Sequence, residues 1–148
     1  MRAVVQRVRR ACCLVDSAIV AEIGKGFVVL LGIGREDKET DLVFLANKIL
    51  NLRVFEDQAG KMNLNLKQAG GSVLLISQFT LYGDARKGNR PSFVEAATPD
   101  VAQAWYEKMA ERLRGEVPTE KGIFQAMMDI ELVNSGPVTI LLDSRKGF

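Results

Sequence analysis

Most of the chain carries the hydrophobic patterns of β-strands. Residues 2–10 alternate apolar and polar positions, which predicts a half-buried strand whose Arg7 shares a face with Val5 and reaches inward. Tight turns are expected at Asp16-Ser17 and over residues 134–137. Short apolar or alternating runs predict further strands over residues 12–16, 18–23, 27–33, 53–55, 61–66, 71–76, 124–133 and 138–142.

Only two long segments have apolar residues at helical spacing. Residues 39–51 form the first, with Asp37 or Thr40 as candidate N-caps, and the second begins at Thr98-Pro99 and ends at Gly115. Because several strands follow one another without a helix between them, a doubly wound fold is excluded. We predict a single α/β domain of the α+β kind over residues 1–148, with a curved or barrel-like mixed sheet and two main outer helices.

The segment from Gly71 to Asp84, GSVLLISQFTLYGD, is the best candidate for a functional site. Its apolar run, residues 73–76, predicts a strand buried on both faces. The strand ends in Ser77-Gln78-Phe79-Thr80, where polar side chains surround one aromatic residue. A buried strand that delivers hydroxyl and amide groups at its end is a natural place for a site.

A charged, glycine-containing loop follows this segment over residues 81–92. It contains three basic residues, Arg86, Lys87 and Arg90. A solvated loop is the simpler interpretation of such a segment taken alone. Because the loop begins directly after the predicted site, a phosphate-contacting role is the alternative.

Two features of the composition restrict the chemistry. The chain has no histidine, which excludes Ser-His-Asp and Cys-His catalysis and every histidine-ligated metal. Its only cysteines, Cys12 and Cys13, are adjacent, so in a strand they point to opposite faces and cannot share a zinc ion. Gly32-Ile33-Gly34 lacks the third glycine of a dinucleotide-binding loop. We expect neither a metal nor a cofactor.

The net charge of +2 does not by itself indicate a nucleic-acid partner. The N-terminus carries charge from Arg2 onward and lacks an apolar signal core, and no apolar run approaches the roughly 20 residues that span a bilayer. With no disulfide framework either, we expect a cytoplasmic protein without a membrane partner.

The residues alone leave an electrostatic mechanism. Ser77 or Thr80 could act as a nucleophile, but no general base is placed near either one by the sequence. Backbone N–H groups at a strand end can stabilise an oxyanion without any titratable side chain, which suits an activated ester attacked by water. Gly136-Pro137 is, on frequency alone, an ordinary trans turn between two strands.

The chain resembles the D-aminoacyl-tRNA deacylase family nearly from end to end. Five motifs in this order carry the resemblance: Gln6-Arg7-Val8, Lys61-Met62-Asn63-Leu64, Ser77-Gln78-Phe79-Thr80-Leu81, Arg90-Pro91-Ser92-Phe93 and Asn134-Ser135-Gly136-Pro137-Val138-Thr139. Each motif is weak alone, but together they are highly specific. The resemblance implies a homodimeric hydrolase that cleaves the ester of D-aminoacyl-tRNA and spares L-aminoacyl-tRNA, with glycyl-tRNA mischarged on tRNA(Ala) as a further substrate.

The resemblance also implies roles for individual residues. Ser77 to Thr80 would form the floor of the pocket, with catalysis by Phe79 and Thr80 through their backbone amides. Gly136-Pro137 would be a cis peptide inserted from the partner subunit, leaving no room for an L side chain. The remaining substrate-binding residues would be Gln78, Phe124, Met128 and Arg7, with Arg7 bracing the Gly-Pro turn.

Two alternatives to a stand-alone deacylase remain open: a non-catalytic tRNA-binding module of the same fold, and an editing domain that works with a synthetase. The first predicts salt-sensitive tRNA binding without turnover. The chain carries no linker within its 148 residues, which favours a stand-alone enzyme.

Overall fold

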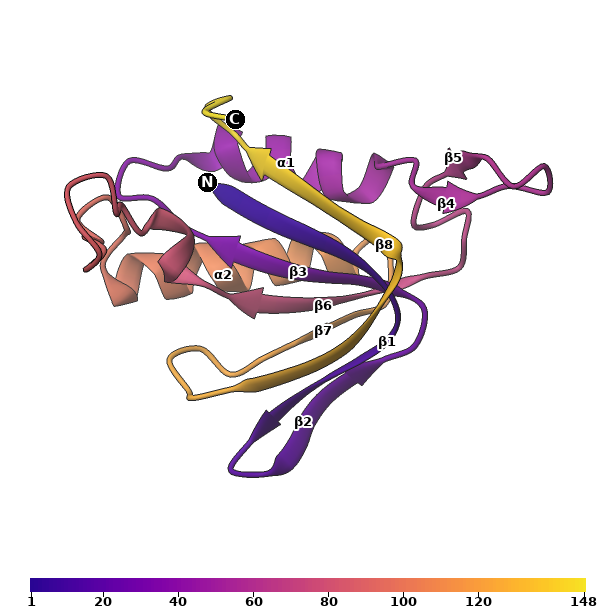
Figure 1. Ribbon diagram of the computed structural model, residues 1–148, viewed down its shortest axis with the longest axis horizontal. Helices are drawn as coiled ribbons and strands as arrows, with labels where there is room; N and C mark the ends of the chain where they lie inside the picture. The colour runs from indigo at the N-terminus through magenta and orange to yellow at the C-terminus, as the bar shows by residue number, and fades with distance from the viewer.

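The computed structural model describes residues 1–148 as one domain with eight strands, two α-helices and one 3₁₀ turn (Figure 1). The strands are β1 (Arg2–Val15), β2 (Ala18–Ile23), β3 (Gly26–Gly32), β4 (Phe55–Glu56), β5 (Met62–Leu64), β6 (Ser72–Ser77), β7 (Thr119–Lys121) and β8 (Asp129–Asp143). The helices are α1 (Glu39–Asn51) and α2 (Pro99–Arg114), and the 3₁₀ turn is η1 (Phe79–Tyr82).

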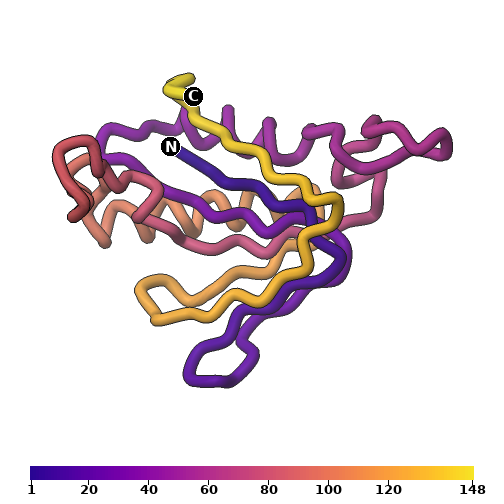
Figure 2. The backbone as a smooth tube through the Cα atoms, in the orientation of Figure 1, coloured from indigo at the N-terminus to yellow at the C-terminus, as the bar shows by residue number.

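The main sheet is mixed and nearly closes on itself. Its order is β2-β1-β3-β6-β7, with β8 paired antiparallel to β1 along almost its whole length. β1 and β3 are antiparallel, whereas β3, β6 and β7 run parallel. Halfway along, β1 and β8 bend together, so that their lower halves and β2 fold beneath β3 and β6 (Figures 1 and 2). β2 contacts β6 and β7, which brings the sheet close to a barrel.

Two hydrophobic cores lie on opposite faces of β3 and β6. Phe27, Val29 and Leu75 belong to the larger core, which α1 and α2 cover, while Val28 and Leu74 belong to the smaller core inside the folded sheet. Successive residues of a strand point to opposite faces, so a strand between two cores needs an unbroken apolar run. The predicted burial of residues 73–76 on both faces is therefore confirmed.

The predicted fold class, both helices and the Asp16-Ser17 turn are confirmed. Thr98 is the residue before α2 and Pro99 opens it, as predicted, but the cap of α1 was wrongly predicted. Lys38 precedes α1, and its N–H donates to the Asp41 carboxylate at 2.8 Å. Asp37 is unavailable as a cap, because it accepts hydrogen bonds from the Met1 ammonium and the Gly34 N–H.

The largest errors concern continuity. The separate strands predicted over residues 2–10 and 12–16 are one strand, β1, because pairing with β8 carries it through the bend. The turn predicted over residues 134–137 is a bulge within β8, and the chain does not reverse there. The strand predicted from Phe124 begins only at Asp129, so Phe124 and Met128 belong to a loop. Neither α1 nor α2 has the length and apolar composition of a membrane-spanning segment.

Candidate active site

The predicted site residues Ser77, Gln78 and Phe79 lie where β6 ends and η1 begins. β6 pairs with β3 up to Ser77, which is opposite Leu31, and the Gln78 N–H then donates to the Leu31 carbonyl at 2.7 Å. The strand therefore stops at Ser77, and Phe79 and Thr80 form the first residues of a 3₁₀ turn. The sequence interpretation had placed all four residues on the strand end.

The start of η1 leaves two backbone donors available. The first bond of the turn joins the Leu81 N–H to the Gln78 carbonyl at 3.2 Å. The N–H groups of Phe79 and Thr80 precede this bond, so they have no acceptor within the turn. Consecutive N–H groups of this kind are suited to binding a developing oxyanion.

An apolar pocket of about 670 Å³ opens beside these donors. Thirteen of its 17 lining residues are hydrophobic. The end of β6, the start of η1 and the residue between them contribute Ser77, Phe79 and Gln78. The loop between β7 and β8 contributes Phe124 and Met128. The structure thus brings together five of the predicted site residues from segments that lie far apart in the sequence.

Two packing contacts position the loop residues. A Cβ on Gly122 would lie 2.7 Å from the Met128 sulfur and 3.0 Å from Ile76 Cδ1, so the absence of a side chain at Gly122 allows Met128 to pack beside β6. Phe124 packs against the ring of Tyr106, with the two centroids 5.8 Å apart.

Tyr106, on the buried face of α2, is a supporting residue that was not among the predicted site residues. Its buried hydroxyl donates to the Leu75 carbonyl at 2.8 Å and also lies 3.2 Å from the Gly122 carbonyl. It therefore ties α2 to β6 and to the exit of β7. Burial raises the pKa of the Tyr106 phenol, so it remains neutral and a donor. A tyrosine among aliphatic residues on a helix stripe was the available signal.

Thr80 does not line the pocket. Its hydroxyl accepts a hydrogen bond from the Gln78 side-chain amide at 2.5 Å. An amide N–H is a donor and cannot act as the base that a threonine nucleophile needs. The hydrogen bond that the Thr80 hydroxyl makes therefore does not activate it as a nucleophile.

Gly136 and Pro137 lie far from this pocket within one chain. Across the sheet, Ser77 of β6 is level with Leu31 of β3 and Ala3 of β1. Asn134 of β8 is level with Val8 of β1, which is itself level with Gly26 of β3 and Ser72 of β6. Five residues of β6, or about 16 Å, separate these two levels along the strands. Figure 1 shows β6 ending on the left and β8 bending on the right. One protomer does not bring the two predicted halves of the site together.

The Gly136-Pro137 bond is cis, and neighbouring side chains hold it closely. Gly136 has φ +135°, and a Cβ there would lie 2.8 Å from Val138 Cγ2 and 2.9 Å from an Arg7 guanidinium nitrogen. Only glycine accepts this conformation and this contact.

Three side chains fasten the bulge around that bond. Arg7 Nε donates to the Ser135 carbonyl at 2.8 Å, and its Nη1 donates to the Val54 carbonyl. The Asn134 amide donates to the Gln6 side chain at 2.6 Å, while its oxygen accepts from the Val138 N–H at 2.7 Å. These contacts give the Gln6-Arg7-Val8 and Asn134-to-Thr139 motifs a shared structural purpose.

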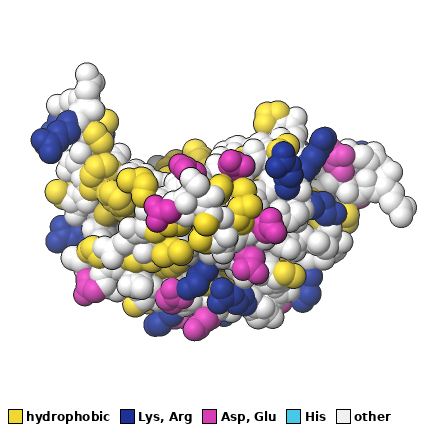
Figure 3. Space-filling model, turned by 90° about the horizontal axis from the view of Figure 1, so that it is seen from below, with side chains coloured by type: hydrophobic (Ala, Val, Ile, Leu, Met, Phe, Trp, Pro, Cys, Tyr) yellow, Lys and Arg dark blue, Asp and Glu magenta, His cyan; other side chains and the backbone are white.

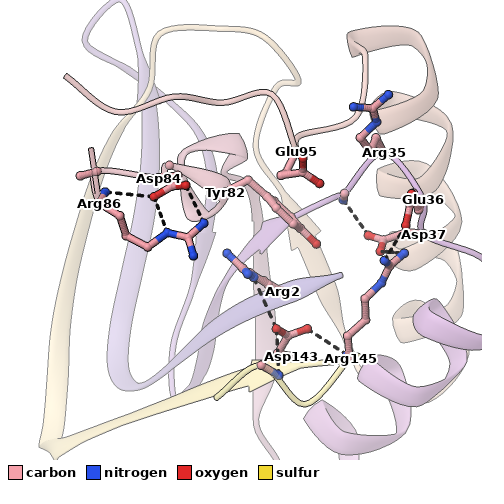
Figure 4. Close-up of a pocket in the computed structure, with 14 residues that line it drawn as sticks. Arg2, Arg35, Glu36, Asp37, Tyr82, Asp84, Arg86, Glu95, Asp143 and Arg145 are labelled. Carbon is pink, nitrogen blue, oxygen red and sulfur yellow. Dashed lines mark hydrogen bonds and ion pairs between the residues drawn. The ribbon is translucent and has the colours of Figure 1, made fainter. Parts of the chain in front are cut away.

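A second cavity, polar and of about 650 Å³, adjoins the far end of η1 (Figure 4). Arg2 crosses it and packs its guanidinium over the Tyr82 ring, and its Nη1 donates to the Leu81 carbonyl at 2.9 Å. Of the three predicted RNA-contacting residues, only Arg86 lines it, and Arg86 is bonded to Asp84 at 2.7 and 2.8 Å. Lys87 and Arg90 lie on the exposed loop, outside both cavities.

Comparison with known proteins identifies the group to which the chain is similar. A family model described as D-Tyr-tRNA(Tyr) deacylase matches residues 4–143. The D-aminoacyl-tRNA deacylase of Kosmotoga olearia is 56% identical over 148 residues, all of both chains. That of Bacillus velezensis is 52% identical over 147 residues, 99% of this chain and 100% of the relative.

Two solved structures share the fold. The c-Myc DNA Unwinding Element Binding Protein superposes with a TM-score of 0.92 at 41% identity, over 97% of this chain and 98% of the other. A probable eukaryotic D-amino acid tRNA deacylase gives a TM-score of 0.79 at 18% identity, over 95% of this chain and 97% of the other, which supports the fold alone. The family model and the full-length relatives confirm the resemblance found in the sequence: the chain belongs to the D-Tyr-tRNA(Tyr) deacylase family.

Proposed function

We propose that this protein hydrolyses the ester of D-aminoacyl-tRNA, releasing the free D-amino acid and tRNA. The observation that carries the proposal is the full-length identity of 52–56% to proteins named D-aminoacyl-tRNA deacylase. The site agrees with it, because an apolar pocket beside two free backbone donors can hold an amino-acid side chain and an ester carbonyl together.

In the proposed mechanism, backbone groups do the chemical work. The ester carbonyl oxygen accepts hydrogen bonds from the Phe79 and Thr80 N–H groups while water attacks the carbonyl carbon. The bond from this carbon to the ribose oxygen then breaks, and that oxygen takes the proton that water releases. The neighbouring ribose hydroxyl is placed to assist the transfer. Because an aminoacyl ester is already activated, oxyanion stabilisation without a side-chain base is a sufficient catalyst.

Chiral selection would come from a second copy of the chain. Gly136-Pro137 of one subunit would face Ser77 to Thr80 of the other as a rigid wall that leaves no room for an L side chain. Glycine has no side chain to exclude, so glycyl-tRNA mischarged on tRNA(Ala) would also be hydrolysed. Two observations support a second subunit at the pocket. Within one chain, Gly136 lies at the end of the strands opposite to the pocket, so it could face a pocket only in another chain. The rim of the pocket is also apolar and exposed.

The exposed rim is substantial. Met127 is 90% exposed and Phe79 is 58% exposed, and both line the pocket. In the view from below, hydrophobic side chains cover much of the left half of the molecule, the side on which β6 ends (Figure 3). An apolar surface of this kind is typical of a contact with another protein surface.

The test of the activity is deacylation of D-tyrosyl-tRNA against L-tyrosyl-tRNA. We expect release of D-tyrosine with L-tyrosyl-tRNA spared. Equal rates on both substrates would contradict the proposal, and tRNA binding without turnover of either would support a non-catalytic binding module instead.

The cross-subunit arrangement is tested by co-expressing two blocked variants. Pro137→Arg would obstruct the partner's pocket, and Ala126→Arg would fill its own pocket, so each homodimer should be inactive. Random pairing gives half mixed dimers, each with one open site, so about a quarter of the wild-type activity should return. If Gly136-Pro137 acted on its own chain, the mixed dimers would stay inactive.

A further inference from the structure

A small cavity of about 440 Å³ lies beside the bend of β1 and β8, at the opposite end of the strands from the apolar pocket. We call it the basic groove: its charged lining is Arg7, Arg9 and Lys25, with one carboxylate, Glu56. Arg7 and Arg9 share a face of β1, and Lys25 lies in the turn between β2 and β3. The bend of β1 and β8 lies on the right of the molecule, and Figure 3 shows several basic side chains on that side.

No carboxylate lies within ion-pair distance of the cations of the basic groove. Arg7, Arg9 and Lys25 are absent from every ion pair of the structure. Arg7 is only 7% exposed, and its hydrogen bonds go to neutral carbonyls, those of Ser135 and Val54. A buried charge without an opposite charge is costly, so an anion in the groove would be stabilised.

The loop beyond η1 also carries cations without an ion pair, Lys87 and Arg90, but these line neither the apolar nor the polar cavity. Arg86 already donates to both oxygens of Asp84. Around the polar cavity, Arg2 and Arg145 likewise have carboxylate partners, Asp143 and Glu36. The polar cavity is lined by five carboxylates, whereas the basic groove has three cations and one carboxylate, so the cations of the groove remain available to a ligand.

We propose that the basic groove binds phosphodiester groups at the 3′ end of the tRNA whose aminoacyl group occupies the partner subunit's pocket. This inference rests on the proposed function. Ser135 lines the groove and directly precedes Gly136-Pro137. If Gly136-Pro137 of one subunit reaches the pocket of its partner, the groove of the first subunit therefore lies at the mouth of the partner's pocket. The tRNA would then contact both subunits: its ester on one, and its backbone phosphates on the other.

The test removes the two exposed cations together, Arg9→Ala with Lys25→Ala, and leaves the buried Arg7 in place. The matched control removes two exposed cations of α2, Lys108→Ala with Arg112→Ala. Each protein is assayed with D-tyrosyl-tRNA and with D-tyrosyl-adenosine, which has no phosphodiester. Binding of deacylated tRNA is measured separately by fluorescence anisotropy.

We expect the groove variant to raise KM for D-tyrosyl-tRNA and Kd for tRNA by about tenfold at low salt, with kcat unchanged. Loss of two single-strand phosphate contacts should reduce the slope of log Kd against log salt by about 1.4. Kinetics on D-tyrosyl-adenosine should stay at the wild-type value, and the control should match wild type throughout.

Two results would overturn the inference: a tRNA Kd and salt slope equal to those of the control, or an equal loss of activity on both substrates. Failure of the proposed function gives a different result, because wild type would then hydrolyse neither substrate. The anisotropy comparison still decides the groove in that case, with weaker binding by the groove variant supporting it and unchanged binding rejecting it.

Discussion

The two ends of the central strands are built in opposite ways. At the end of β6, the backbone of η1 offers free N–H groups beside an apolar pocket, and few side chains bond to it. At the bend of β8, Gln6, Arg7 and Asn134 bond to the Gly136-Pro137 bulge or to one another. The first end leaves polar backbone groups for a substrate, and the second end uses side chains to fix the backbone in place.

This difference matches the proposed roles. A catalytic oxyanion site needs donors that have no protein acceptor before the substrate arrives. A wall that rejects one stereoisomer needs the reverse, a surface that does not yield when the wrong side chain presses on it. Variants at four positions, beginning with the donors, put this difference to the test.

Removal of one free donor should have the largest effect. Phe79→Pro removes the N–H at the first position of η1, where the fixed φ of proline is tolerated. We expect kcat to fall by about 10²–10³-fold relative to Phe79→Ala, which loses the same ring and keeps the N–H. Single-turnover deacylation of D-tyrosyl-tRNA measures this. Equal kcat in the two variants would reject the backbone mechanism.

Disturbance of the wall should come next. Gly136→Ala would place a Cβ against Val138 and Arg7 at φ +135°, so the free energy of unfolding should fall by about 1–3 kcal/mol. Denaturant melts check this, and the ratio of D to L deacylation should drop as well. Gly60→Ala is the matched control, because Gly60 has φ +74° with nothing within 4 Å. A variant at Gly136 that kept full selectivity would show that the wall lies elsewhere.

Loss of the Thr80 hydroxyl should matter much less. Thr80→Ala removes only the hydrogen bond to Gln78 and retains the backbone N–H, so kcat should fall by less than about tenfold. A fall to the uncatalysed rate would restore Thr80 as a nucleophile. Steady-state kinetics on D-tyrosyl-tRNA are sufficient here.

The smallest effect is expected in the loop beside the site. Arg86 holds the pKa of the Asp84 carboxyl well below its usual range, so the pair persists until strongly acidic pH. A carboxyl whose pKa is lower in the folded than in the unfolded protein contributes stability above the unfolded value of about 4, and this stability is lost as pH falls. Arg86 is largely exposed, however, so solvent screens the pair. We therefore expect Arg86→Ala to leave the melting temperature at pH 7 unchanged. Its KM for D-tyrosyl-tRNA should change less than that of the groove variant.

The sequence anticipated local elements well and long-range ones poorly. The helix spacing of residues 39–51 and the buried run at residues 73–76 depend on neighbours in the chain, and both were predicted correctly. The continuity of β8 was missed, because Asn134 to Pro137 has the composition of a turn. Pairing with β1 overrides that local preference and keeps both halves in one strand.

The sequence alone was sufficient to identify the family. The absence of histidine excludes a histidine base, and the five ordered motifs identify the deacylase family. Only the tertiary structure decided that Ser77 and Gly136 lie at opposite ends of the strands, and that Arg7, Arg9 and Lys25 share one groove. The physical reason is that strand register and bends are set by pairing between distant segments, which no local pattern encodes.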